Sequence, residues 1–153
     1  MPDFRLGRRI AIDYGSARIG VASSSVDGLF ANPLATVIND ENALEEIRKH
    51  VLETEPIEIY VGLPLNLKGE RTASTDSAIG FAKSLAVLIS EPIRLVDERM
   101  STRAAQGQIR HSGKNTQQSR SFIDAAAATL ILEGALAFEK GSGRSPGISV
   151  TEF

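Results

Sequence analysis

The chain has 153 residues, of which 42% are hydrophobic and 24% charged, the size and balance of one globular domain. It contains no cysteine and only two histidines, which excludes disulfides, Cys-ligated zinc and iron–sulfur clusters and argues against a histidine-rich metal site. No apolar stretch approaches the roughly 20 residues of a membrane span, and the polar, basic start has no signal-like apolar core. We therefore expect a cytoplasmic protein that does not contact membranes.

Charge is unevenly distributed along the chain, although its net value is only −2. Residues 99–123 contain no acid, whereas residues 40–58 are rich in Asp and Glu. The basic residues of the first stretch are Arg99, Arg103, Arg110, Lys114 and Arg120. Such a separation indicates either one anion-attracting face or two solvated helix surfaces.

Hydrophobic periodicity and turn residues predict alternating strands and helices. Extended segments are expected at 8–14, 19–23, 34–38, 57–63 and 93–96, the third of them beginning after a break at Asn32–Pro33. Helices are expected from Asn39 or Asp40 to about Thr54, over 75–90, from Ser101 or Thr102 to near Gly113, and over 122–140. This order predicts an α/β fold with a mixed sheet, an N-terminal antiparallel hairpin and helices on both faces. We expect one domain over residues 1–140 and a flexible tail over 141–153.

Asp13 lies in an otherwise apolar predicted strand. A lone buried carboxylate costs several kcal/mol, so such a residue normally has a partner. The alternative is that Asp13 caps the turn at Gly15. Residues 13–20 read D-x-G-x-x-x-x-G, a pattern shared by nucleases and by actin-type ATPases.

Three further acids lie at the ends of predicted elements. Asp97 and Glu98 end a strand, at the edge of an α/β sheet where ligands bind, and the alternative is that they pair with Arg99. Adjacent strand residues face opposite sides, so only one of the two acids should reach a given site. Asp124 with Ser121 fits S-x-x-D, which indicates a helix start, yet an acid in the first turn of this apolar helix also needs a counter-charge.

If Asp13, Glu98 and Asp124 converge, they should prefer a divalent cation. Two carboxylates about 5 Å apart repel by roughly 3 kcal/mol at an effective dielectric near 20. Oxygen ligands suit Mg²⁺ or Mn²⁺, and a pair of such ions can stabilise both the attacking and the leaving oxygen of a phosphodiester. A glycosidase would need one protonated acid and an open cleft for sugar, which fits the basic stretch less well.

Four segments carry a recognisable pattern: IAIDYGSARIGVA at 10–22, IYVGLPLNLKG at 59–69, VDERMST at 96–102 and IDAAAATLILEGAL at 123–136. Together they resemble the YqgF/RuvX family of Holliday-junction-resolvase-like proteins over nearly the whole chain to about Glu139. The resemblance implies a ribonuclease H-like fold and a metal-dependent nuclease that matures the 5′ end of pre-16S rRNA. It also implies that Asp13, Glu98 and Asp124 are catalytic and bind the metal, with Asp97 as the alternative to Glu98.

The expected substrate is structured RNA, and ribosomal precursor particles are expected partners. Candidates for holding the nucleic-acid backbone are Arg18, Lys68, Arg71 and Arg99, and the alternative for each is plain surface solvation. Branched DNA stays open as a substrate, and its symmetric cleavage would require a homodimer. A non-catalytic nucleic-acid-binding assembly factor also stays open. An actin-type ATPase is the third alternative, and we do not expect it, because 153 residues leave no room for the second domain that such enzymes need.

Overall fold

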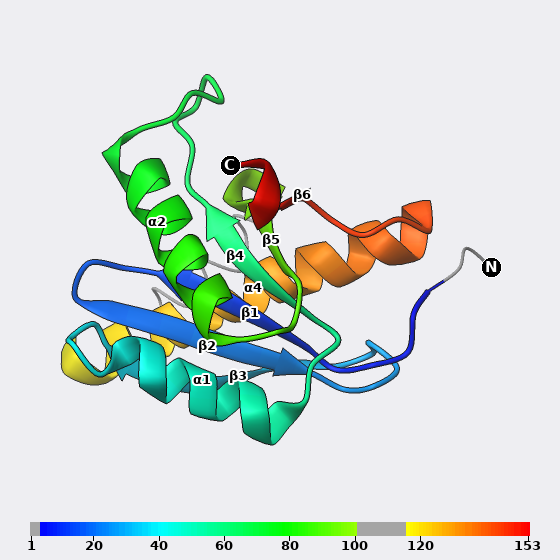
Figure 1. The fold of residues 1–153 in the computed structure, drawn as a ribbon, viewed down its shortest axis with the longest axis horizontal. Coiled ribbons are helices and arrows are strands. Elements are labelled where there is room, and N and C mark those ends of the chain that lie inside the picture. Colours follow the sequence, from blue (N-terminus) through cyan, green and yellow to red (C-terminus); the bar gives the residue numbers. More distant parts are fainter. Residues whose placement is uncertain (1–3, 101–115) are drawn as a thin grey trace.

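The computed structural model of the chain describes residues 4–100 and 116–153, and describes only the backbone of Met100 and of residues 116–124. Its strands form one mixed sheet in the order β3-β2-β1-β4-β5-β6 (Figure 1). The strands are β1 (Arg9–Tyr14), β2 (Arg18–Ser24), β3 (Ala31–Ile38), β4 (Glu58–Leu63), β5 (Ile93–Asp97) and β6 (Ile148–Ser149). Strands β1 to β3 pair antiparallel, β4 and β5 run parallel to β1, and β6 closes the edge antiparallel to β5.

Helices cover both faces of the sheet. They are α1 (Ala43–Thr54), α2 (Ala73–Leu88) and α4 (Thr116–Ser142), with the short 3₁₀ turns η1 (Glu98–Met100) and η2 (Val150–Glu152). Figure 1 shows α1 and α2 in front of the sheet and α4 behind it. Along β1 the side chains alternate between two cores: Ile10 and Ile12 pack on the side of α1 and α2, and Ala11 packs on the side of α4. The predicted α/β architecture with helices on both faces is confirmed.

The third strand starts earlier than predicted. Asn32 and Pro33 do not break the chain but lie inside β3, opposite Ser23 and Ala22. Proline is tolerated there because β3 is an edge strand, and the pairing with β2 shifts register beside it, between Val21 and Ala22.

Helix boundaries also differ from the sequence patterns. Helix α1 is preceded by Asn42, and Asp40 instead accepts a hydrogen bond from the Asn42 backbone. Helix α4 already includes Thr116, the first residue described after the gap, so the prediction that Ser121 and Asp124 begin this helix is wrong. No glycine or proline separates residues 116–122 from the apolar segment, so the helix continues through them. The predicted helix over 101–113 lies outside the described residues.

The C-terminal segment belongs to the fold, which differs from the predicted flexible tail over 141–153. Strand β6 pairs with β5, and the Arg94 guanidinium donates hydrogen bonds to the carbonyls of Pro146 and Gly147. Val150 is buried, and Phe153 packs against the same core as α1 and α2. A two-residue strand is too short to produce a periodic pattern, so the sequence did not reveal it. Among the helices of the described residues, none is long and apolar enough to cross a membrane.

Candidate functional site

The two acids predicted from different strands meet at one edge of the sheet. Because β1, β4 and β5 are parallel, their carboxyl ends lie side by side. Asp13 is half-buried near the end of β1, and Glu98 is the first residue of η1, directly after β5. The two side chains lie close enough for the charge and hydrogen bonding of Asp13 to act on Glu98. They face α4, since Asp13 follows Ala11 in the alternation along β1.

Gly62, in β4 between these strands, makes room for the acid pair. A Cβ atom at this position would lie 2.7 Å from Glu98 Oε1 and 2.7 Å from Ile131 Cδ1 on α4. Any side chain at position 62 must therefore displace the Glu98 carboxylate or Ile131. The sequence analysis gave Gly62 no role, although a glycine inside an apolar strand is a signal of close approach by another group.

The environment of Glu98 disfavours its charge. Burial, followed by the charge and hydrogen bond of Asp13 and the charge of Asp97, raises the pKa of Glu98 to about 7. Near neutral pH the Asp13–Glu98 pair therefore retains a proton for part of the time. A pair of carboxylates that holds a proton between them is a site where a cation can take that proton's place.

Asp97 is directed to a different partner. Its Oδ1 accepts hydrogen bonds from the backbone N–H and the Nε of Arg99, and its Oδ2 lies 2.6 Å from Arg99 Nη2. The Arg99 guanidinium holds the pKa of Asp97 below its usual value. Of the two adjacent acids, Glu98 is thus the one that the structure brings to Asp13. The sequence could not decide this, because the strand ends at Asp97 and its alternation does not extend to the next residue.

Arg99 also lies against the loop that joins β4 to α2. A Cβ atom at Gly69 would come within 3.1 Å of Arg99 Nη1. This loop is held as a tight turn by Asn66, whose Oδ1 accepts hydrogen bonds from the backbone of Lys68 and Glu70. The fixed turn places the exposed side chain of Lys68 on the same loop that contacts Arg99.

The remaining predicted site residues are more dispersed. Arg71 is exposed and forms an ion pair with Asp76 at 2.7 Å. Arg18 is half-buried at the start of β2, beside the carboxyl end of β1. The backbone of Asp124 belongs to α4, and its side chain lies outside what the structure describes. Among the described side chains, which exclude Asp124, no three acids or histidines form a group able to hold a metal ion.

Sequence comparison links the chain to one family. The model of the RuvX family, described as Holliday junction resolvase, matches residues 7–137. A protein of Clavibacter michiganensis is 46% identical over 149 residues, covering 95% of this chain and 92% of its own. One of Streptomyces coelicolor is 47% identical over 152 residues, covering 97% and 91%. Both carry the name "Putative pre-16S rRNA nuclease".

Structural comparison supports the same fold. The structure of Thermus thermophilus RuvC in complex with a Holliday junction substrate aligns with a TM-score of 0.63, covering 91% of this chain and 99% of that one. At 14% identity this similarity concerns the fold alone, and it confirms the predicted ribonuclease H-like architecture. The predicted resemblance to the YqgF/RuvX family is confirmed as well: this chain belongs to the RuvX family of nucleases.

Proposed function

We propose that this chain is a divalent-metal-dependent nuclease that acts in the cytoplasm on the 5′ end of pre-16S rRNA. The observation that carries the proposal is the Asp13–Glu98 pair, held above Gly62 at the carboxyl edge of the sheet. The names of the relatives direct the choice of substrate toward precursor rRNA.

The donor set fits a hard divalent cation. Asp13 and Glu98 offer only carboxylate oxygens, which Mg²⁺ and Mn²⁺ prefer. We include Asp124 in the set because the resemblance to the RuvX family assigns it the same role, and because α4 covers the face of the sheet that Asp13 faces. One or two cations bound there would act as Lewis acids that stabilise the negative charge developing on the phosphate.

The chain's own groups supply the rest of the chemistry. Glu98 releases its proton when a cation binds, because the cation then stabilises the carboxylate form. Arg99, oriented by its two-pronged contact with Asp97, is a donor to phosphate oxygens, and Lys68 on the neighbouring loop adds a second positive charge. The carboxylates thus act at the scissile phosphate, and the positively charged side chains of Arg99 and Lys68 hold the nucleic-acid backbone beside it.

The direct test is cleavage by Asp13→Asn. We expect this variant to lose at least about 1,000-fold in rate on a 16S precursor RNA with Mg²⁺ or Mn²⁺, as expected for removal of a metal ligand. A four-way DNA junction assayed in parallel distinguishes the two substrates, and sedimentation with and without the junction tests for a dimer. Cleavage by Asp13→Asn at the wild-type rate would show that the assignment is wrong.

Asp97→Asn is the matched control, because it removes a neighbouring acid that contacts Arg99 and not Asp13. We expect it to raise KM several-fold through loss of Arg99 orientation while kcat changes little. Wild-type protein that binds precursor RNA but shows no metal-stimulated cleavage would favour the alternative of a non-catalytic assembly factor.

A further inference from the structure

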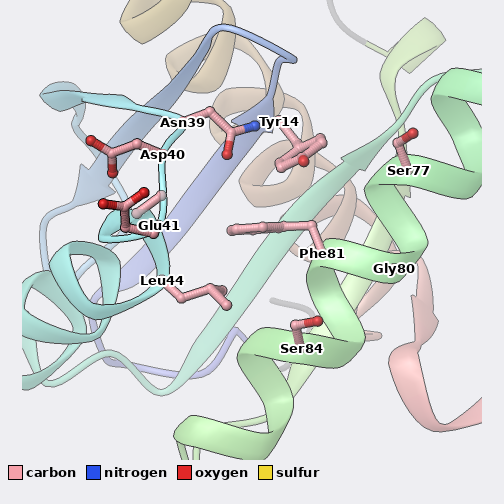
Figure 2. Close-up of a pocket in the computed structure, with 10 residues that line it drawn as sticks. Tyr14, Asn39, Asp40, Glu41, Leu44, Ser77, Gly80, Phe81 and Ser84 are labelled. Carbon is pink, nitrogen blue, oxygen red and sulfur yellow. The ribbon is translucent and has the colours of Figure 1, made fainter.

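A pocket of about 500 Å³ lies between α1 and α2, on the opposite face of the sheet from the Asp13–Glu98 pair. The alternation along β1 separates the two sites: Asp13 faces α4, and the next residue, Tyr14, faces the pocket. Figure 2 shows Phe81 reaching from α2 toward Leu44 on α1, with Tyr14 beside it. The pocket is therefore separate from the proposed catalytic site.

The inner wall of the pocket is formed by two aromatic side chains, the half-buried Tyr14 and the edge of the core residue Phe81, which is 8% exposed. The rings of Tyr14 and Phe81 stack with their centroids 4.7 Å apart. Apart from Phe81, the residues of α2 that line the pocket are small, namely Ser77, Gly80 and Ser84, and this leaves space beside the ring. A Cβ atom at Gly80 would meet no other group within 4 Å, so this side of the pocket is open.

The rim of the pocket is acidic. The exposed carboxylates of Asp40 and Glu41 lie side by side at its edge (Figure 2). Among the described residues neither acid forms an ion pair, whereas Glu45, one turn along α1, is paired with Arg48. Exposed acids continue along α1, including Glu46 and Glu53, so the potential at this face is negative.

We infer that this pocket receives the arginine side chain of a basic, extended peptide from a partner protein. A guanidinium is planar, stacks on aromatic rings and donates paired hydrogen bonds to carboxylates, so it matches the Tyr14–Phe81 wall and the Asp40–Glu41 rim together. Lysine offers a point charge without the flat face and should fit less well. Because the two sites lie on opposite faces, the peptide and a nucleic-acid substrate can be bound at the same time.

Charge complementarity favours a peptide over a nucleic acid. A nucleotide that placed its base against Phe81 would bring its phosphates next to Asp40 and Glu41, and like charges at that distance repel. A basic peptide brings the opposite charge to the same rim. Proteins that bind nucleic acid are rich in such segments, which makes them suitable partners for a nuclease.

The test measures binding of two capped peptides to the intact protein by calorimetry: tetra-arginine and tetra-lysine. We expect the arginine peptide to bind at least fivefold more tightly than the lysine peptide. Gly80→Leu, which fills the open side of the pocket, and the double variant Asp40→Asn/Glu41→Gln should each weaken the arginine peptide at least tenfold. The matched control, Glu46→Gln/Glu53→Gln, removes two acids from the same helix outside the pocket and should change affinity by less than twofold.

Three outcomes would overturn the inference. Equal affinity for the two peptides would mean that no guanidinium site exists. An equal loss in the control variant would mean that the whole acidic face attracts cations without a pocket. Binding of a single-stranded oligonucleotide that is lost in Gly80→Leu, with peptide binding unchanged, would assign the pocket to a nucleobase. If Gly80→Leu does not fold, the rim variant decides the result alone, since both of its positions are exposed.

Discussion

The two ends of the parallel strands carry buried acids with opposite surroundings. At the amino end, Glu139 of α4 is fully buried, and its carboxylate lies 2.8 Å from Arg9 Nη2 and 2.6 Å from Arg5 Nη2. At the carboxyl end, the groups that shift the pKa of Glu98 are the acids Asp13 and Asp97. The same sheet thus surrounds Glu139 with arginines, whereas the described groups that shift the pKa of Glu98 are themselves acids.

The pKa values follow this difference. Burial raises the pKa of Glu139, but the hydrogen bonds from Arg5 and the charge of Arg9 outweigh it and hold the pKa below its usual value. Burial and neighbouring acids act together on Glu98 and raise its pKa to about 7. The charged form of Glu139 is thus stabilised by arginines of the same chain, whereas the surroundings of Glu98 favour its protonated form.

The largest expected effect is a loss of stability when the acid at the amino ends of the parallel strands, Glu139, is replaced. Glu139→Gln leaves Arg9 buried without its charge partner, so we expect the free energy of unfolding to fall by about 3–5 kcal/mol. Urea denaturation measures this loss, and cleavage per folded molecule should be unchanged. Glu45→Gln breaks an exposed pair with Arg48 and should lower the free energy of unfolding far less, because water screens exposed charges. Equal losses in the two variants would contradict the compensating role of Arg9.

The next effect is on activity, and it results from displacing the Glu98 carboxylate without changing its charge. Gly62→Ala places a methyl group against the Glu98 carboxylate and Ile131, both flexible side-chain ends, so the chain should fold with a loss of about 1–2 kcal/mol. Cleavage should fall by about 100-fold, because displacing a catalytic group by about 1 Å has that consequence. Gly80→Ala is the matched control: its Cβ meets open space, so activity should stay and helix stability should rise by about 0.5–1 kcal/mol. Retained activity in Gly62→Ala would remove Glu98 from the proposed site.

The smallest effect is the pH dependence of stability without metal. A carboxyl whose pKa is raised from 4.5 to about 7 binds more protons in the folded state than in the unfolded state, so stability falls as pH rises between these values. Thermal unfolding in a chelator should show this decline, and Glu98→Gln should flatten it. Excess Mg²⁺ should stabilise the wild type increasingly as pH rises through 7, because the cation binds the deprotonated pair. A stabilisation by Mg²⁺ that persists in Glu98→Gln would point to a different metal site.

Much of the fold could be predicted from periodicity, because the central strands are buried on both faces and consist almost entirely of apolar residues. Asp13 was visible for the same reason, as one acid in an apolar strand. The features that could not be predicted depend on where one secondary-structure element ends and the next begins. Whether Asp97 or Glu98 meets Asp13 is decided by η1 starting directly after β5, and no sequence pattern marks that change of backbone.

The other unpredicted features depend on distant contacts. Gly62 gains its role only from Glu98 and Ile131, which lie more than thirty residues away along the chain. Residues 148–149 form a strand only because β5 offers them a free edge. Residues 116–120 are already helical, which shows the limit of a local pattern: a capping motif within a helix-forming stretch does not by itself begin a helix.

The contact between Gly62 and Glu98 links two positions that evolution should not change independently. A relative that acquires a side chain at position 62 has no space for a carboxylate above β4, so it should also have lost or moved its acid at position 98. Under the proposed function, glycine at position 62 together with glutamate at position 98 indicates that a chain of this family has retained a site fit for cleavage. We expect a chain with only one of these two residues to bind nucleic acid without cleaving it.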